Sequence, residues 1–116
     1  MERHDLQLLE HIIDYCDDIK DALAIVNNTY DSFLTNKMAQ YTIAFSILQI
    51  GELVGGLSES LRAVSKREID WPAVKGMRNI IVHHYGEVRL GVVWNVAVND
   101  IPILKEFCER HLSEEF

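Results

Sequence analysis

Apolar residues recur at intervals of three and four along the chain, and this spacing places them on one face of an α-helix. No segment of the sequence shows the pattern of a β-strand. The pattern predicts long helices over about 5–26, 36–63, 71–85 and 88–112, with an extra helical turn over 30–34. We therefore expect an all-α protein whose four long helices form an up-down antiparallel bundle.

The first predicted helix has one apolar face and one acidic face. Its apolar positions, which we expect in the core, are Leu9, Ile12, Cys16, Ile19, Leu23 and Val26. Its acidic positions are Asp14, Asp17, Asp18 and Asp21. We interpret the acidic face as solvated, and a partner surface is the less favoured alternative.

Four residues indicate where the third and fourth helices begin, end or bend. Asp70 is suited to cap the N-terminus of the third helix, and Pro72 is tolerated in its first turn. Gly86 is a natural stop for that helix. Pro102 lies inside the fourth helix and removes a backbone donor, so we expect a kink or split near residues 99–100.

The second predicted helix carries a carboxylate on an apolar stripe. Tyr41, Phe45 and Leu48 share this stripe, and Glu52 continues it one turn later. A buried carboxylate would need a partner, which Arg78 or a backbone donor could supply. A peripheral position for Glu52 is the favoured alternative.

Three glycines, Gly51, Gly55 and Gly56, weaken the second helix, because each costs up to ~1 kcal/mol relative to alanine. We expect them to permit a close approach of two helices or a bend. A direct functional role for these glycines is the less favoured interpretation.

Composition places the chain among ordinary globular proteins. Its 116 residues are 48% hydrophobic and 25% charged, and we expect one domain over 1–116. No apolar run approaches the ~20 residues that span a bilayer, and the N-terminus leads into no signal-peptide core. We expect a cytoplasmic protein without membrane contact. Cys16 and Cys108 match no redox or zinc spacing, so both are expected to be reduced and at least partly buried.

The net charge of −7 argues against a general nucleic-acid binder, but the charge is unevenly distributed. Residues 62–89 carry a net charge of +3, whereas residues 1–61 and 90–116 carry −7 and −3. A basic segment on an acidic chain is consistent with a local phosphate contact. A stretch of this length also becomes basic by chance, so both explanations remain open.

The basic segment contains an arginine, a histidine and a tyrosine on the third predicted helix. At 100° per residue, one side of this helix collects Lys75, Arg78, Asn79, His83 and Tyr85. His84 falls on the apolar side, where a structural role is expected. Imidazole exchanges protons near neutral pH, and a guanidinium stabilises charge on a phosphate. Arginine and histidine are therefore sufficient to cleave RNA without a metal.

Arg78 and His83 stand 140° apart on this helix, so they flank a site rather than stack. A single histidine cannot act as base and acid at the same instant, and a second subunit on a two-fold axis would supply another. The alternative is that both residues are simple interface groups. No metal-ligand spacing, serine elbow or glycine-rich phosphate loop occurs in the sequence, so we expect no metal and no cofactor.

The pattern Arg78-x-x-x-x-His83-x-Tyr85 resembles the motif of HEPN-domain ribonucleases. Further matching strings occupy residues 49–52, 69–72, 76–79 and 100–102. Together they are similar to the HepT family, the toxin half of HepT–MntA toxin–antitoxin pairs. The resemblance covers nearly the whole chain.

This resemblance implies a metal-independent endoribonuclease that works as a homodimer, with Arg78 and His83 catalytic and Asn79 supporting them. It also implies a partner, an MntA-type nucleotidyltransferase antitoxin that transfers AMP from ATP to Tyr85 and silences the nuclease. Lys75 and Arg89 of the basic segment are candidate RNA contacts.

Two other functions remain open. The chain could be a non-catalytic helical module that binds a nucleotide or a substrate beside a nucleotidyltransferase. It could also be a plain dimerising bundle.

Overall fold

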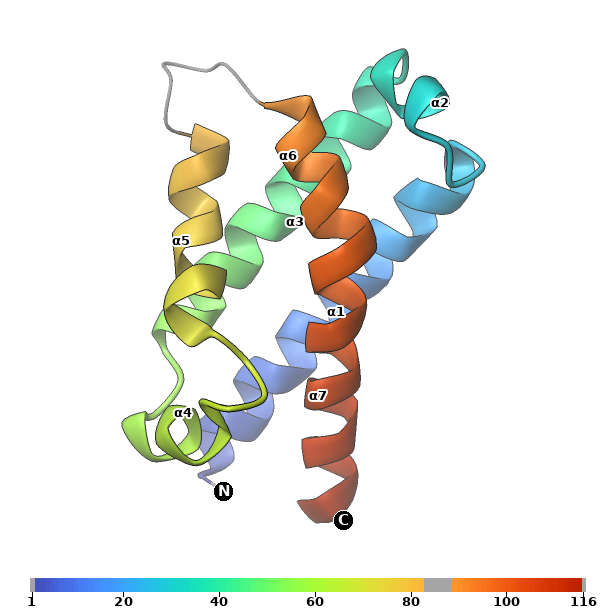
Figure 1. Cartoon of the computed structure of the whole chain (residues 1–116). Coiled ribbons are helices and arrows are strands. Elements are labelled where there is room, and N and C mark those ends of the chain that lie inside the picture. Colours follow the sequence, from blue (N-terminus) through green and yellow to red (C-terminus); the bar gives the residue numbers. More distant parts are fainter. Residues whose placement is uncertain (1, 83–88, 116) are drawn as a thin grey trace.

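The computed structural model describes residues 2–82 and 89–115 (Figure 1). Its elements are α1 (Arg3–Ile25), α2 (Tyr30–Leu34), α3 (Lys37–Gly55), α4 (Glu59–Ser65), α5 (Trp71–Val82), α6 (Leu90–Asn95), the π-helical turn η1 (Val96–Asp100) and α7 (Ile101–Glu115). No strand occurs within the described ranges. The predicted all-α fold is confirmed.

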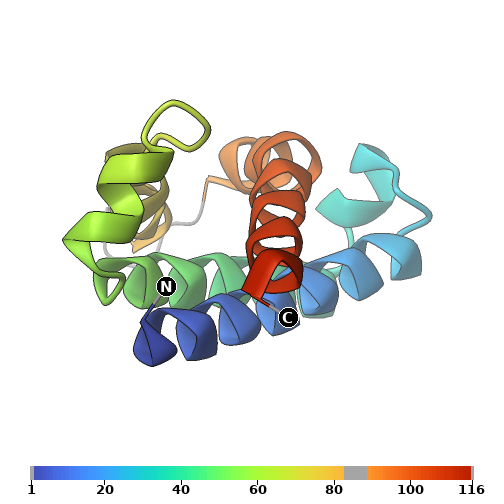
Figure 2. The same cartoon turned by 90° about the horizontal axis from the view of Figure 1, so that it is seen from below.

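The helices pack in two layers. Figure 2 shows α1 and α3 side by side in one layer, with α5 and α7 on the same side of it. α3 contacts both α1 and α5, and α1 also contacts α7. The start of α1 and the end of α7 lie at the same end of the molecule (Figure 1). This arrangement puts α5 beside α3, where the candidate site lies.

The core lies where α1, α3 and α7 meet, and the predicted apolar stripe of α1 is part of it. Its fully buried members include Leu9, Ile12, Ile19, Ile43, Ile47, Ile50, Leu104 and Phe107. Burying each such side chain contributes roughly 1.5–3 kcal/mol. Cys16 and Cys108 are free and buried, as predicted. Burial raises the pKa of the Cys16 thiol to about 12 and that of Cys108 well above its usual value, so both stay protonated at neutral pH.

The prediction of a single helix over 36–63 is wrong, because the structure has two helices there, α3 and α4. α3 ends at Gly55, and α4 begins at Glu59 after a bend of 106°. Ser58 caps α4, and its backbone N–H donates a 2.9 Å hydrogen bond to the carboxylate of Asp5. Because Ser58 caps the start of α4 and also bonds to Asp5 of α1, a new helix begins at this point and α3 ends before it.

The predicted irregularity before Pro102 occurs as a π-helical turn over Val96–Asp100. This wider turn accommodates a residue that cannot donate a backbone hydrogen bond, so the helix continues instead of breaking.

The apolar stripe that contains Tyr41 and Phe45 lies on the outer face of α3 rather than in the core. Tyr41 is 61% exposed, Phe45 is 55% exposed, and Met38, one or two turns before them, is 75% exposed. We call these three residues the outer α3 stripe. α3 has an apolar inner face as well, so periodicity could not indicate which face is buried.

No single helix in the described ranges has both the length and the apolar character that a membrane crossing requires. The bent pair of α3 and α4 satisfies both conditions only when taken together, by length and composition alone.

Candidate functional site

Helix α5 carries the described part of the Arg-His-Tyr motif, and its start is fixed by hydrogen bonds. The carboxylate of Asp70 accepts the backbone N–H of Ala73 at 3.1 Å, which confirms the predicted cap. The indole N–H of Trp71 donates to the hydroxyl of Ser65 at 2.9 Å in a buried position. The first bond caps α5, and the second joins its first turn to the end of α4.

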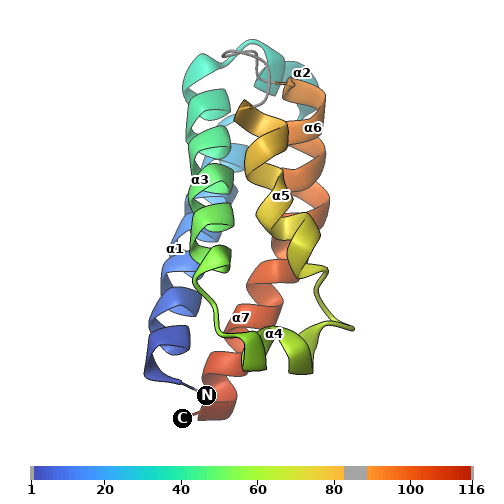
Figure 3. The ribbon, with the colours of Figure 1, turned by 90° about the vertical axis from the view of Figure 1, so that its left-hand side faces the viewer.

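The orientation of α5 follows the side expected from the sequence. Val74 and Met77 are buried, whereas Lys75, Arg78 and Asn79 are exposed. The polar side of the helix is therefore exposed, and the helix itself lies beside α3 (Figure 3).

Gly51 allows α3 and α5 to approach closely at Arg78. A Cβ atom at Gly51 would lie 3.3 Å from the Cβ of Arg78 and 3.5 Å from the carbonyl oxygen of Lys75. A Cβ at Gly55 would lie 3.7 Å from the Cε of Lys75, so the lysine side chain extends across that glycine. The predicted close approach of two helices is confirmed at Gly51.

Glu52 pairs with Arg78. The Glu52 Oε1 atom lies 2.7 Å from the Nε atom of Arg78, and the two side chains are 52% and 55% exposed. An exposed pair of this kind contributes roughly 0–1 kcal/mol to stability. Its main effect is to orient the guanidinium. Both sequence alternatives hold in part, because Glu52 is peripheral and yet has Arg78 as its partner.

A cavity of about 340 Å³ lies between α3 and α5 at this pair. Its lining residues are Gly51, Glu52, Gly55, Pro72, Lys75, Gly76, Arg78 and Asn79. We call it the Arg78 cavity. Its volume falls within the ~300–1,000 Å³ typical of small-ligand sites. Three candidate residues from the sequence, Lys75, Arg78 and Asn79, therefore share one site.

The remaining candidates are not part of this described geometry. His83 and Tyr85 lie outside the described residues, as do His84 and Gly86. Arg89 is described and exposed at the start of α6, and it does not line the Arg78 cavity. Among the described residues, no group of three or more His, Cys, Asp or Glu side chains could hold a metal ion.

Arg78 can orient a phosphate and balance the negative charge on it, and the Asn79 amide can donate and accept hydrogen bonds beside it. Lys75 adds a second cation. Sequence reasoning did not select Glu52 as a site residue. The only signal was its spacing of four residues after Leu48 on an outward stripe.

A family model described as ribonuclease HepT-like matches residues 12–111. A protein of Thermococcus cleftensis named as a probable ribonuclease HepT is 30% identical over 105 residues, which cover 84% of this chain and 92% of the relative. A candidate RNase of Methanocaldococcus jannaschii is 29% identical over 115 residues, covering 98% of this chain and 93% of the relative.

A second protein of Methanocaldococcus jannaschii, named as a gamma-glutamylcyclotransferase and candidate RNase, is 33% identical over 113 residues. This chain spans about half of that longer relative, 50% of its length. No solved structure matches the chain. The match of the family model over most of the sequence shows that the chain belongs to the HepT-like ribonuclease family.

Proposed function

We propose that this protein is a metal-independent endoribonuclease and the toxin of a toxin–antitoxin pair. The observation that carries the proposal is the Arg78 cavity, which brings Arg78, Asn79 and Lys75 together in a member of the HepT-like ribonuclease family. The candidate RNase names of its relatives support the same activity.

The chemistry follows from RNA itself. A base takes the proton of the 2′-hydroxyl, whose oxygen then bonds to the phosphorus while the bond to the 5′ oxygen breaks. An acid returns a proton to that leaving oxygen, so the products are a 2′,3′-cyclic phosphate and a 5′-hydroxyl. We assign the proton transfers to His83 from the sequence motif. Arg78 stabilises the charge that develops on the phosphate, and Asn79 orients its oxygens.

A homodimer would supply the base and the acid from two copies of His83. The outer α3 stripe supports this arrangement. At 100° per residue, Met38, Tyr41 and Phe45 fall on the same side of α3 as Glu52, within about 60° of one another. A second copy that covered this stripe across a two-fold axis would bury exposed apolar surface and bring both Arg78–Glu52 pairs toward the same interface.

A nucleotidyltransferase antitoxin would silence this site through Tyr85. The tyrosine oxygen would bond to the α-phosphorus of ATP, pyrophosphate would leave, and the hydroxyl proton would pass to solvent. Tyr85 follows Arg78 by seven residues, so if helical spacing extends to Tyr85, an added phosphate there would compete with the substrate for the arginine.

The first test is RNA cleavage in EDTA by protein produced without an antitoxin, beside Arg78→Ala and His83→Ala. We expect cleavage that EDTA spares and that both substitutions abolish, with 2′,3′-cyclic phosphate ends. His11→Ala is the matched control, because His11 is exposed on α1, away from the Arg78 cavity. Loss of cleavage in EDTA, or full activity of His83→Ala, would contradict the mechanism.

The dimer has its own test. Phe45→Glu places a charge on the outer α3 stripe and should yield folded monomers that do not cleave RNA. Ile103→Glu makes the same change at an apolar residue of α7 that is 58% exposed, and it should leave both the dimer and the activity intact. A fully active, dimeric Phe45→Glu variant would place the interface elsewhere.

The second candidate function is a non-catalytic module that binds a nucleotide for a nucleotidyltransferase. The volume of the Arg78 cavity, which lies in the range of small-ligand sites, favours it. It predicts ATP binding that Arg78→Ala weakens, without cleavage of any RNA.

A further inference from the structure

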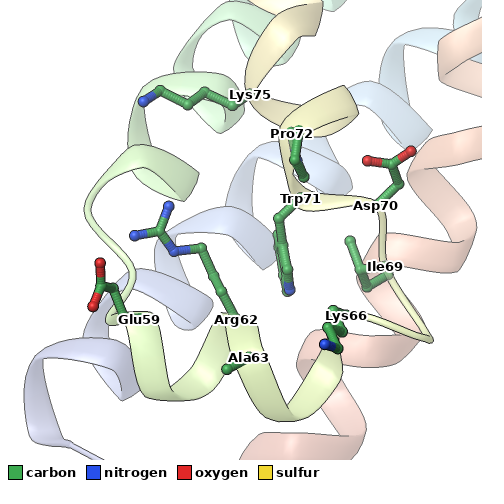
Figure 4. A pocket seen from close by; sticks show the side chains of 9 residues that line it. All are labelled: Glu59, Arg62, Ala63, Lys66, Ile69, Asp70, Trp71, Pro72 and Lys75. Carbon is green, nitrogen blue, oxygen red and sulfur yellow. The ribbon is translucent and has the colours of Figure 1, made fainter.

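A second and larger cavity adjoins the Arg78 cavity. It has a volume of about 680 Å³ and lies between α4, the α4–α5 connection and the first turn of α5 (Figure 4). Pro72 and Lys75 line both cavities, so the two are neighbours along α5. We call the second one the α4–α5 cavity.

Three cations line the α4–α5 cavity: Arg62, Lys66 and Lys75. Arg62 lies on α4, and Lys66, four residues later, caps its C-terminus, so the two lie on one face of α4 about 6 Å apart along its axis. Lys75 reaches the cavity from α5, and Figure 4 shows it on the same side of the cavity as the Arg62 guanidinium.

None of these three cations makes an ion pair with a described residue. By contrast, Arg78 pairs with Glu52, Lys105 with Asp17 and Arg110 with Glu68. The Nε atom of Arg62 is also buried without a hydrogen-bond partner in the described structure. A buried donor without a partner is unfavourable, so a turn of the side chain that brings it to an acceptor of a ligand would be favoured.

Two carboxylates also line the cavity, and both serve helix starts. Asp70 accepts the backbone N–H of Ala73 as the cap of α5. Glu59 lies in the first turn of α4, where the helix dipole favours a negative charge. The cavity therefore keeps a net charge of +1 on a chain of net charge −7.

Trp71, which lines the cavity, is fixed in position by its contacts. Trp71 is only 3% exposed, its indole N–H bonds to Ser65, and its ring meets Phe107 edge-on at a centroid distance of 5.3 Å. The cations of α4 and α5 are consequently presented on a fixed surface, which lowers the entropic cost of binding.

We propose that the α4–α5 cavity is a second phosphate-binding subsite, which holds the RNA strand as it continues from the Arg78 cavity. Lys75 contacts the strand between the two cavities, and Arg62 and Lys66 bind its next phosphates. This inference rests on the proposed function and specifies its substrate as single-stranded RNA that extends past the cleaved bond. An unpaired strand can bend from one cavity into the other around Pro72, whereas a paired strand keeps its helical path.

The test compares the double variant Arg62→Gln/Lys66→Gln with wild-type protein on two substrates. For an octanucleotide, KM should rise about tenfold while kcat stays unchanged, because both residues bind phosphates that do not react. A dinucleotide, which spans only the cleaved bond, should be cut equally by both proteins. Lys20→Gln/Lys37→Gln makes the same charge change at exposed sites on α1 and α3 and should change neither KM value.

A binding measurement keeps this inference separate from the proposed function. The probe is a fluorescent 2′-O-methyl octanucleotide, which cannot be cleaved because it has no free 2′-hydroxyl. The double variant should bind it more weakly, with a salt slope smaller by about 0.7 for each lost contact. Glu59→Gln removes a negative charge from the lining of the α4–α5 cavity and should tighten binding of the probe.

The outcomes are distinct. Wild-type cleavage with no effect of the double variant on the octanucleotide would overturn the subsite and leave the proposed function standing. An equal loss on both substrates would also overturn it, since the residues would then act on the reaction itself. Binding of the probe that depends on Arg62 and Lys66, in a protein that cleaves nothing, would support the subsite while the proposed nuclease fails.

Discussion

The two cavities that meet at Lys75 hold their arginines in different ways. In the Arg78 cavity, a carboxylate lies 2.7 Å from the arginine and fixes its orientation. In the α4–α5 cavity, Arg62 makes no ion pair with a described residue, and its Nε atom has no hydrogen-bond partner there. An oriented guanidinium suits a phosphate that reacts, whereas an unpaired one suits a phosphate that is only bound. Substitutions in the first cavity should therefore change the rate, and those in the second should change the affinity.

The largest expected effect is that of Arg78→Lys. The charge is kept, but the planar fork of donors and its contact with Glu52 are lost, so kcat should fall by about 10²–10³. Single-turnover cleavage would measure this loss, with circular dichroism to show an intact fold. Arg62→Lys is the matched control in the other cavity, and its kcat should stay near the wild-type value. Equal losses in the two variants would remove the distinction between the cavities.

Gly51→Leu should have the next largest effect, because it alters the packing behind Arg78. Even a Cβ atom at this position lies 3.3 Å from the Cβ of Arg78, and a larger side chain must push α3 and α5 apart. We expect a loss of roughly 1–3 kcal/mol in the free energy of unfolding, together with reduced kcat. Urea unfolding and cleavage assays would measure the two quantities. Unchanged stability would mean that the helices do not approach closely here.

Glu52→Gln should have a moderate effect that falls on catalysis rather than on folding. The pair with Arg78 is more than half exposed, so the free energy of unfolding should change by less than about 1 kcal/mol. The arginine would lose its orienting charge, and kcat should fall several-fold while KM changes little. An increase in activity would show instead that Glu52 restrains Arg78 and competes with the phosphate.

The smallest effect is expected for Gly76→Ala. Gly76 belongs to α5 and lines the Arg78 cavity. Apart from its chain neighbours and the backbone of its own helix, no described residue has an atom within 4 Å of a Cβ built at this position, so the methyl group meets open space. Alanine favours the helix by up to about 1 kcal/mol, and the variant should be slightly more stable. Thermal unfolding would detect this change. A destabilised Gly76→Ala variant would show that a surface covers this glycine in the assembled protein, as a dimer partner would.

Much of the helical structure could be predicted because its causes are local. Asp70 caps α5 through a backbone donor three residues away, and Pro102 perturbs only its own and the preceding turn. The apolar stripe of α1 was predicted because its opposite face is strongly acidic, so only one face could be buried. The polar side of α5, with Lys75, Arg78 and Asn79, followed from the same kind of contrast.

The division of the second predicted helix did not follow from sequence, because a distant contact enforces it. Asp5 accepts a hydrogen bond from Ser58, 53 residues away, and this contact anchors the start of α4 beside α1. The exposure of the outer α3 stripe could not be predicted either. α3 is apolar on more than one face, and only its neighbouring helices determine which face is covered.

The sequence by itself therefore determined most of the helices, the cap of α5, the polar side of α5 and the family to which the chain belongs. These features depend on hydrogen bonds and periodicities that act within a few residues. The tertiary structure decided that Glu52 meets Arg78, that Lys75 is shared by two cavities, and that Arg62 has no partner among the described residues. Those facts depend on how closely separate helices approach one another. The approach is set by contacts between residues far apart in the chain, namely the packing of α5 against Gly51 and the hydrogen bond of Ser58 to Asp5.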